Sequence, residues 1–197
     1  FFYNSIDENI IIERAFEGVE YPKIHEGLKL ITVGRLTEKK GYYRLISILA
    51  KLKKEGYDFS LVIIGDGPER EKLLKHCDEL NMNDRVVFLL EQKNPFKYVS
   101  KSDAFICSSF EEGYSTACTE ACILNVPVVT TSVGGAEEII NDAGCGLLCD
   151  LSDEGLYGAL KSVLDNPQMI DEWKETLKDT KKNFFASERV KRLYNIF

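Results

Sequence analysis

The chain has no long apolar run. Its apolar stretches, such as residues 61–64 and 126–129, fall far short of the roughly 20 residues that cross a bilayer, so we expect no transmembrane helix. A basic segment followed by an apolar one is also missing near the start, where Asp7, Glu8 and Glu13 interrupt the sequence, and this argues against a signal peptide. The first residue is Phe1 rather than Met, as is expected of a piece of a longer protein.

Positive charge is in deficit. Lysine and arginine number 25 against 32 aspartates and glutamates, which gives a net charge of −7. Phosphate backbones are bound by clustered positive charge, so the composition excludes general nucleic-acid binding as the function. The other proportions, 44% hydrophobic and 29% charged, are those of an ordinary soluble globular protein. A length of 197 residues suits a single domain.

Histidine is scarce, with two residues, whereas cysteine is not, with six. Cys107 lies in the apolar run DAFIC, and Cys118 and Cys122 fall on a predicted core helix. Neither His25 nor His76 is near these cysteines in sequence, and structural zinc sites prefer tighter spacings. We therefore expect buried thiols in a reducing compartment and no metal site.

Segments of strand and helix character alternate along the chain. Near-continuous apolar runs such as FSLVIIG are typical of strands that are buried on both faces of a sheet. The strands are predicted at residues 28–34, 59–65, 86–90, 103–109, 126–131 and 146–149. The helices are predicted at residues 41–55, after Pro68, and at 95–100, 116–124, 137–141, 153–164, 167–181 and 187–197.

This alternation predicts an α/β fold, a Rossmann-like parallel sheet with helices on both faces, because parallel neighbours need long crossovers. We assign residues 1–197 to one domain, with a lead-in at 1–27, a core at 28–165 and C-terminal helices at 166–197. Ligands of such sheets bind beyond the carboxyl ends of the strands. Glycines and polar residues should therefore gather directly after the strands, and they do.

The segment SSFEEGYSTACTEAC is the most informative for function, because it holds Glu112 and Glu120 with seven residues between them. Ser108, Ser109 and Gly113 favour a turn around Glu112, and a helix is expected from residue 116 onward. Both carboxylates should then face one small volume together with free amides at the helix end. Carboxylates accept hydrogen bonds from hydroxyls and helix ends bind anions, so a ligand with hydroxyls and phosphates would suit both.

Other candidate contacts follow the first, second and fifth predicted strands. In GRLTEKKG, Arg35 and Lys40 could hold a diphosphate, although a solvated basic loop is the alternative. In GDGPER, the turn of Gly65, Asp66 and Gly67 allows a close backbone approach, yet such turns often lack function. SVGGAEEII leaves ligand contact and structural turn equally open.

Taken together, these motifs resemble the C-terminal, nucleotide-sugar-binding half of the family-4 (group 1) retaining glycosyltransferases, whose two-domain architecture is called GT-B. The matching text runs from about residue 30 to 164 and comprises VGRLTEKKG, VIIGDGPER, NPFKYVSKSDAFICSSFEEGYSTACTEA, VPVVTTSVGGAEEII and GLLC. The wording around NPF and FEEGYS is particularly similar to bacterial enzymes of capsule, exopolysaccharide and lipopolysaccharide assembly. The resemblance implies transfer of a sugar from a nucleotide sugar, with retention of the anomeric configuration.

The resemblance also implies roles for single residues. Arg35 and Lys40 would hold the donor diphosphate and stabilise the leaving nucleotide without a metal. Glu120 would accept hydrogen bonds from the ribose, and Glu112, which with Arg35 and Lys40 forms the implied catalytic set, would contact the transferred sugar. The full implied donor site is Gly34, Arg35, Lys40, Gly65, Asp66, Gly67, Leu90, Glu112, Gly113, Tyr114, Ser115, Thr116 and Glu120. A UDP-sugar is the expected donor, with no cofactor.

Several departures from the family pattern stand beside these roles. At the position of Asn125 the family commonly has glycine. At the position of Ser115 it commonly has glycine or proline. A glycine often found near Leu90 is also missing, which leaves the preferred base open. The N-terminal domain, which binds the acceptor, is absent from these residues, so this chain alone should bind the donor without turnover.

Alternatives remain on the same fold. One is an enzyme of the nucleotide-sugar epimerase or phosphorolytic type, and another is a non-catalytic GT-B-type module. The last helices are rich in lysine and arginine beside acidic residues, which favours a solvated surface or a contact with the missing domain; a peripheral membrane contact is the alternative. We expect a cytoplasmic location, with the inner face of the membrane as the place of that contact.

Overall fold

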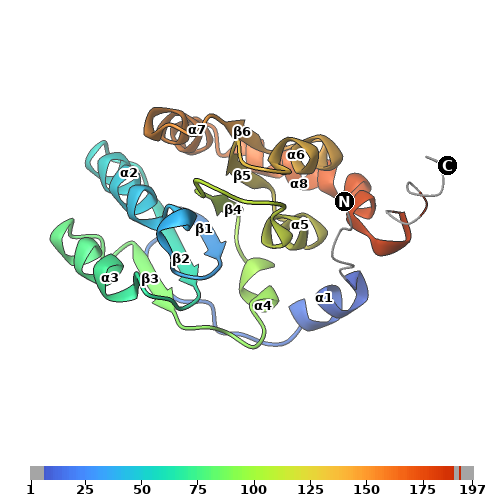
Figure 1. Cartoon of the computed structure of the whole chain (residues 1–197), viewed down its shortest axis with the longest axis horizontal. Coiled ribbons are helices and arrows are strands. Elements are labelled where there is room, and N and C mark those ends of the chain that lie inside the picture. The colour runs from blue at the N-terminus through green and yellow to red at the C-terminus, as the bar shows by residue number, and fades with distance from the viewer. Residues whose placement is uncertain (1–6, 189–190, 192–197) are drawn as a thin grey trace.

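The protein is built around a six-stranded parallel sheet with the strand order β3-β2-β1-β4-β5-β6. The structure, a computed structural model, describes residues 7–188 and residue 191 (Figure 1). The strands are β1 (Leu28–Val33), β2 (Phe59–Ile64), β3 (Val86–Leu89), β4 (Ala104–Cys107), β5 (Val128–Thr131) and β6 (Leu147–Cys149). The helices are α1 (Glu8–Ala15), α2 (Tyr42–Lys54), α3 (Arg70–Glu79), α4 (Phe96–Val99), α5 (Thr116–Ile123), α6 (Ala136–Ala143), α7 (Asp153–Asp165) and α8 (Gln168–Thr180), with short 3-10 helices η1 (Glu38–Lys40) and η2 (Lys181–Phe184).

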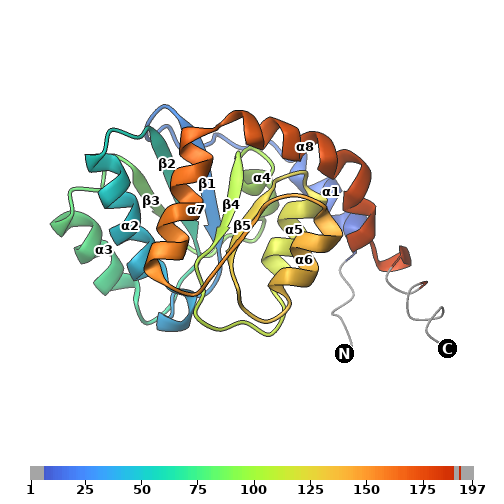
Figure 2. The ribbon, with the colours of Figure 1, turned by 90° about the horizontal axis from the view of Figure 1, so that it is seen from above.

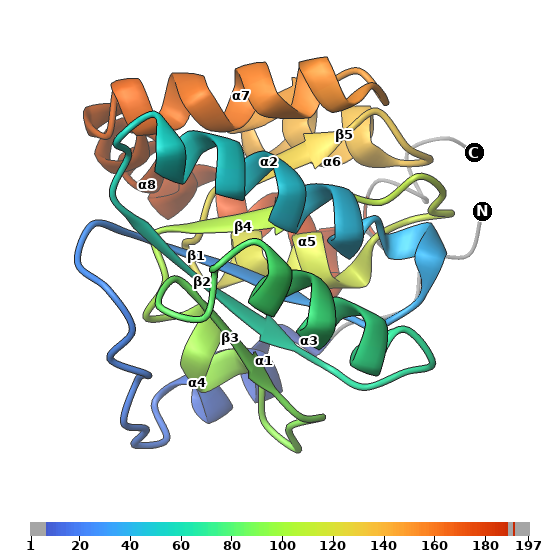
Figure 3. The ribbon, with the colours of Figure 1, turned by 90° about the vertical axis from the view of Figure 1, so that its left-hand side faces the viewer.

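Helices cover both faces of the sheet, as Figures 2 and 3 show. Successive strand residues point to opposite faces, so Leu30 belongs to one core and Ile31 to the other. The first core is completed by α2, α3 and α7, and the second by α1, α4, α5 and α6. Helix α8 joins the layers, because Ile170 near its start packs in the first core and Leu177 in the second. The predicted Rossmann-like α/β fold is confirmed.

The strand order places a topological switch between β1 and β4. β2 and β3 extend the sheet on one side of β1, and β5 and β6 extend it beyond β4. In open parallel sheets, ligands bind outside the carboxyl ends of the strands at such a switch point, which here are β1 and β4. The loops that follow these two strands carry Lys40 and Glu112.

All six predicted strands are shorter in the structure, and β4 and β5 differ from the prediction by more than one residue. β5 begins at Val128 rather than at residue 126, because the Val126 N–H bonds to the Ala121 carbonyl and closes the end of α5. β4 ends at Cys107, and the carbonyl oxygens of Ser108 and Ser109 are taken by a side chain of α2 instead of a neighbouring strand. Both differences arise from hydrogen bonds to residues outside the strands.

Asn125 shows how one departure from the resembled family is accommodated. It directly follows the C-cap of α5 and has a φ of 64°, in the left-handed region. Glycine is the usual residue there, and asparagine is the side chain that tolerates it best. The turn between α5 and β5 is therefore kept without glycine.

Helix α1 is an element that the sequence did not predict, since we treated residues 1–27 as a lead-in. Asp7 caps the helix by accepting hydrogen bonds from the amides of Asn9 and Ile10. Ile11 is buried against the second core, and Asn94 donates from its amide to the Arg14 carbonyl at 2.8 Å. The lead-in thus covers part of the same face as α4 and α5. The cap followed by ENIIIERA was the available signal.

The C-terminal end is only partly described. Helix α8 corresponds to the helix predicted at 167–181, whereas most of the helix predicted at 187–197 lies outside the described residues. Within the described ranges, no helix combines the length and the apolarity that a bilayer crossing requires. The peripheral membrane contact stays a prediction.

The cysteines are free thiols, and five of the six are buried; Cys149 is half-buried. Cys107, Cys118 and Cys122 belong to the second core, which confirms their predicted place among apolar residues. In the described part of the chain, no three His, Cys, Asp or Glu side chains gather as a metal-binding group. All six cysteines pack in or against the two apolar cores.

Candidate functional site

The two loops at the switch point meet through an ion pair. Lys40, in η1 after β1, donates from Nζ to Oε1 of Glu112, in the loop between β4 and α5. The side chains are 27% and 14% exposed, so water screens the pair only in part. The sequence predicts that both residues reach the carboxyl edge, and the structure shows that they contact each other directly.

Glu112 is held from its own loop as well. The Ser109 hydroxyl donates to Oε1 of Glu112 at 2.8 Å, so this oxygen accepts from both the ammonium and the hydroxyl. Behind this loop packs the turn between β5 and α6. A Cβ added at Gly134 would lie 2.4 Å from the Glu112 carbonyl oxygen, so a side chain there would displace the loop. This close packing supports a structural role for the glycine turn in SVGGAEEII. Ligand contact at that turn stays a prediction.

A cavity of about 400 Å³ opens beside the ion pair, at the carboxyl ends of β1 and β2. Its wall includes the predicted site residues Gly34, Arg35, Gly65 and Asp66, together with Val33, Ile64, Glu91, Gln92 and Pro95. Glu91, Gln92 and Pro95 were not predicted as site residues. They follow β3, and their position after a strand was the only sequence signal.

Gly34 links the cavity to the ion pair. A Cβ added there would lie 3.7 Å from Lys40 Nζ, so the ammonium lies next to the cavity wall. Arg35 is exposed, and its guanidinium has no hydrogen bond or ion pair with any other described residue. The cavity therefore has one available cation and a second that is paired with Glu112.

The turn after β2 is shaped by packing against the loop after β1. Gly65 has a φ of +148°, and an added Cβ would lie 2.0 Å from the Gly34 carbonyl oxygen. An added Cβ at Gly67 would lie 2.4 Å from the Leu36 carbonyl oxygen. Asp66 accepts a hydrogen bond from the Gly67 amide at 2.8 Å. Packing alone accounts for both glycines, and donor contact at this turn stays a prediction.

Glu120 lies one turn inside α5, as predicted. Its carboxylate has no hydrogen-bond or ion-pair partner in the described part of the chain, and burial raises its pKa to about 7. An ionisable group that is desolvated without a compensating donor destabilises the fold, and such groups concentrate at functional sites. Glu120 is a candidate to receive hydrogen bonds from a ligand.

The remaining predicted residues surround the start of α5. Ser115 is the N-cap and accepts a hydrogen bond from the Cys118 amide at 3.3 Å, and Thr116 begins the helix. Gly113 is exposed, and the Tyr114 ring lies against Gly135. Leu90 follows β3 and is 50% exposed, outside the wall of the 400 Å³ cavity. No contact in the described residues joins Arg35 to Glu112 or Glu120.

A second, wider cavity of about 720 Å³ lies at the opposite, amino edge of the sheet. It is lined by residues 20–27 with Lys29 and Ser60. None of the residues predicted for the site lies in its wall. It is a competing candidate for the place of a ligand.

Comparisons with known proteins give the family of this chain. Among curated proteins, the chain is 32% identical to the N-acetylgalactosamine-N,N'-diacetylbacillosaminyl-diphospho-undecaprenol 4-alpha-N-acetylgalactosaminyltransferase of Campylobacter jejuni, over 92% of this chain and 48% of that protein. It is 28% identical to the lipopolysaccharide core biosynthesis glycosyltransferase LpsD of Rhizobium meliloti, over 84% of this chain and 47% of that protein. The chain thus spans about half the length of these relatives.

A solved structure with a similar fold is that of Anabaena HepE in complex with UDP, with a TM-score of 0.77 and 18% identity over 99% of this chain and 57% of that one. The complex of HepE with UDP-glucose gives a TM-score of 0.74 and 17% identity over the same shares. A family model described as "Glycosyl transferases group 1" matches residues 14–182. The chain therefore belongs to the group 1 glycosyltransferases.

Proposed function

We propose that this chain is the donor-binding domain of a glycosyltransferase that moves a sugar from a UDP-sugar to an acceptor with retention of configuration. The observation that carries the proposal is the meeting of Lys40 and Glu112, 72 residues apart in sequence, beside the Arg35 cavity at the sheet's carboxyl edge. Two cations for a diphosphate and one carboxylate for hydroxyls, that of Glu112, lie there in adjoining loops. UDP and UDP-glucose in the HepE structures support the choice of nucleotide.

The chemistry follows from the charges. As the bond between the sugar's anomeric carbon and the diphosphate oxygen breaks, negative charge grows on the diphosphate, and Arg35 and Lys40 stabilise it without a metal. The acceptor oxygen bonds to the anomeric carbon on the face that the diphosphate leaves, and its proton passes to the departing phosphate oxygen. Glu112 orients the sugar and Glu120 the ribose. Neither glutamate acts as a nucleophile in this scheme.

The acceptor belongs to the remaining half of the protein. The C. jejuni and R. meliloti relatives are about twice as long as this chain, and their names describe transfer to a diphospho-undecaprenol-linked sugar and lipopolysaccharide core synthesis. We infer a second domain that binds the acceptor, so that this chain alone binds UDP-sugar without turnover. The name of the R. meliloti relative supports a role in bacterial surface polysaccharide synthesis. We place that role in the cytoplasm, at the inner membrane face.

Calorimetric titration with UDP-glucose, GDP-glucose and ADP-glucose tests the proposal. We expect UDP-glucose to bind most tightly and Arg35→Ala to weaken that binding by about 1.5–3 kcal/mol, the value of a charge-assisted contact. Lys54→Ala is the matched control, because Lys54 is an exposed cation at the far end of α2. A wild-type chain that binds none of the three nucleotide sugars contradicts the proposal, as does equal binding by the Arg35 variant.

A further inference from the structure

Arg44 is a buried cation with no place in the donor site described above. It lies in the first turn of α2, and its side chain is 5% exposed. A cation is unfavourable at the positive end of a helix, and burial lowers the pKa of Arg44, so neither the helix nor solvation favours a charge here. Its hydrogen bonds must supply the compensation.

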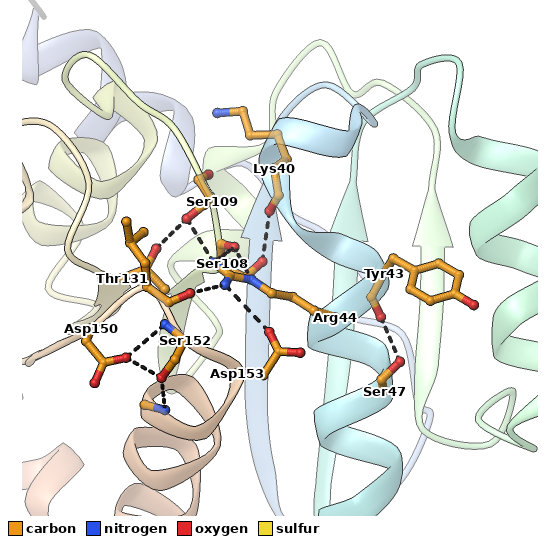
Figure 4. A network of polar contacts seen from close by, with 12 residues as sticks. Lys40, Tyr43, Arg44, Ser47, Ser108, Ser109, Thr131, Asp150, Ser152 and Asp153 are labelled. Carbon is orange, nitrogen blue, oxygen red and sulfur yellow. Dashed lines mark hydrogen bonds and ion pairs between the residues drawn. The ribbon is translucent and has the colours of Figure 1, made fainter.

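The guanidinium joins α2 to two loops at the carboxyl edge (Figure 4). Nε and Nη2 donate to the Ser108 carbonyl at 3.0 and 2.6 Å, and Nη2 also donates to the Ser109 carbonyl at 2.9 Å. Nη1 donates to the Leu151 carbonyl, in the loop between β6 and α7, at 2.5 Å. Asp153 stands 3.7 Å from Nη1, and the Phe110 ring is stacked 3.7 Å from the guanidinium carbon.

Ser108 and Ser109, whose carbonyls Arg44 holds, also form hydrogen bonds to Lys40 and Glu112 of the proposed donor site. The Ser108 hydroxyl donates to the Lys40 carbonyl at 2.9 Å, and the Ser109 hydroxyl donates to Glu112 at 2.8 Å. The Thr131 hydroxyl donates to the Ser109 carbonyl at 2.6 Å, so this peptide is held from two sides. Both members of the Lys40–Glu112 pair therefore depend on backbone that Arg44 holds.

We propose that Arg44 is a positioning residue, which orients Lys40 and Glu112 toward the donor by fixing the backbone of Ser108 and Ser109. The role rests on the proposed function of that site. A planar fork that reaches three carbonyls of two loops is specific to arginine, because a lysine ammonium is a single point charge. Even a displacement of about 1 Å in a binding group weakens a complex strongly, because hydrogen bonds depend steeply on distance and angle.

Arg85 provides a matched control. It is also largely buried, at 12% exposed, and its Nη1 donates to the carbonyls of Tyr57 and Phe59 at 3.2 and 3.5 Å. These hydrogen bonds lie at the amino edge of the sheet, away from the proposed site. Arg85→Lys therefore reports what the loss of an arginine fork does to the fold alone.

The test is a double-mutant cycle that combines Arg44→Lys with the paired change Ser108→Ala and Ser109→Ala, read by calorimetric titration with UDP-glucose on folded protein. Arg44→Lys should weaken binding about tenfold in the wild-type background and less than about threefold in the background without the two hydroxyls, because the Ser108 and Ser109 hydroxyls carry its effect to Lys40 and Glu112. Arg85→Lys should lower the unfolding midpoint but leave UDP-glucose affinity unchanged.

The outcomes distinguish a failure of the Arg44 positioning role from a failure of the proposed donor-binding function. An Arg44→Lys variant that binds like the wild type overturns the positioning role and leaves the proposed function standing. The same tenfold loss in the background without the two serine hydroxyls also overturns it, since a purely structural role acts without them. A wild-type chain that binds neither UDP nor UDP-glucose overturns the proposed function, and the positioning role with it.

Discussion

Glu120→Gln should make the protein more stable and bind UDP-glucose more weakly. Burial raises the Glu120 pKa to about 7 from its ordinary value of 4.5. The unfolded chain therefore ionises first as pH rises, so stability is lost between about pH 4.5 and 7 and stays low above that range. Glutamine removes this loss, and the variant's free energy of unfolding at pH 8 should exceed the wild type's by about 2–3 kcal/mol.

Urea unfolding at several pH values measures this effect. Near pH 4 the two proteins should have similar stability, because the wild-type carboxyl is then protonated in the folded state. The control Glu172→Gln changes an exposed carboxyl on α8 and should shift stability by less than about 0.5 kcal/mol. If the Glu120→Gln variant is no more stable at pH 8 than the wild type, ionisation of Glu120 does not cost the folded protein stability, and this account of Glu120 is wrong.

The same substitution should weaken UDP-glucose binding about tenfold, because the amide offers one acceptor oxygen to the ribose hydroxyls in place of two. Wild-type affinity should also rise from pH 6 to pH 8 as Glu120 ionises, and this dependence should be absent in the variant. Higher stability together with lower affinity is typical of a residue that serves a ligand at the expense of the fold.

Lys40→Ala should weaken UDP binding by about 1.5–3 kcal/mol, whereas Glu112→Gln should tighten it. In the free protein Lys40 pairs with Glu112, so a diphosphate must compete with that carboxylate for the ammonium. Removal of the Glu112 charge releases Lys40 and also removes a negative charge near the phosphates. UDP-glucose should gain less than UDP, because Glu112 is proposed to contact the sugar.

Titration of UDP into the wild type, both single variants and the double variant measures the coupling between the two positions. In a Lys40→Ala background, Glu112→Gln should lose most of its tightening effect, since there is no ammonium left to release. Lys39→Ala is the matched control, because Lys39 pairs with Glu111 on the exposed side of the same loops. UDP binding by Lys40→Ala at wild-type strength would rule out Lys40 as a phosphate ligand.

The sheet could be predicted from sequence because its strands are buried on both faces. A fully buried strand such as Phe59–Ile64 must be apolar throughout, and that leaves a plain signal. The strand ends were harder to predict. The Val126 amide bonds within the turn that ends α5, and the Ser108 carbonyl accepts from Arg44, 64 residues away. Helix α1 was missed since its stripe of apolar residues is short and lies within a polar segment.

For the site, the sequence could predict only that the candidate residues lie at the carboxyl edge of the sheet. The loops of Lys40 and Glu112 follow adjacent strands of the sheet, so topology alone brings them together. Their direct pairing depends on side-chain geometry that spacing does not encode. Arg44 was missed for a related reason: α2 was recognised by its apolar face, and the partners of Arg44 are backbone carbonyls 64, 65 and 107 residues away.

The most direct test of the donor site is amide chemical-shift mapping by NMR with UDP-glucose. We expect the largest shifts at Gly34, Lys40 and Gly113 and along the first turns of α5 to Glu120, with the amino edge of the sheet unaffected. Shifts confined to the wider cavity around residues 20–27, with the loops after β1 and β4 unchanged, would contradict a donor site at the carboxyl edge.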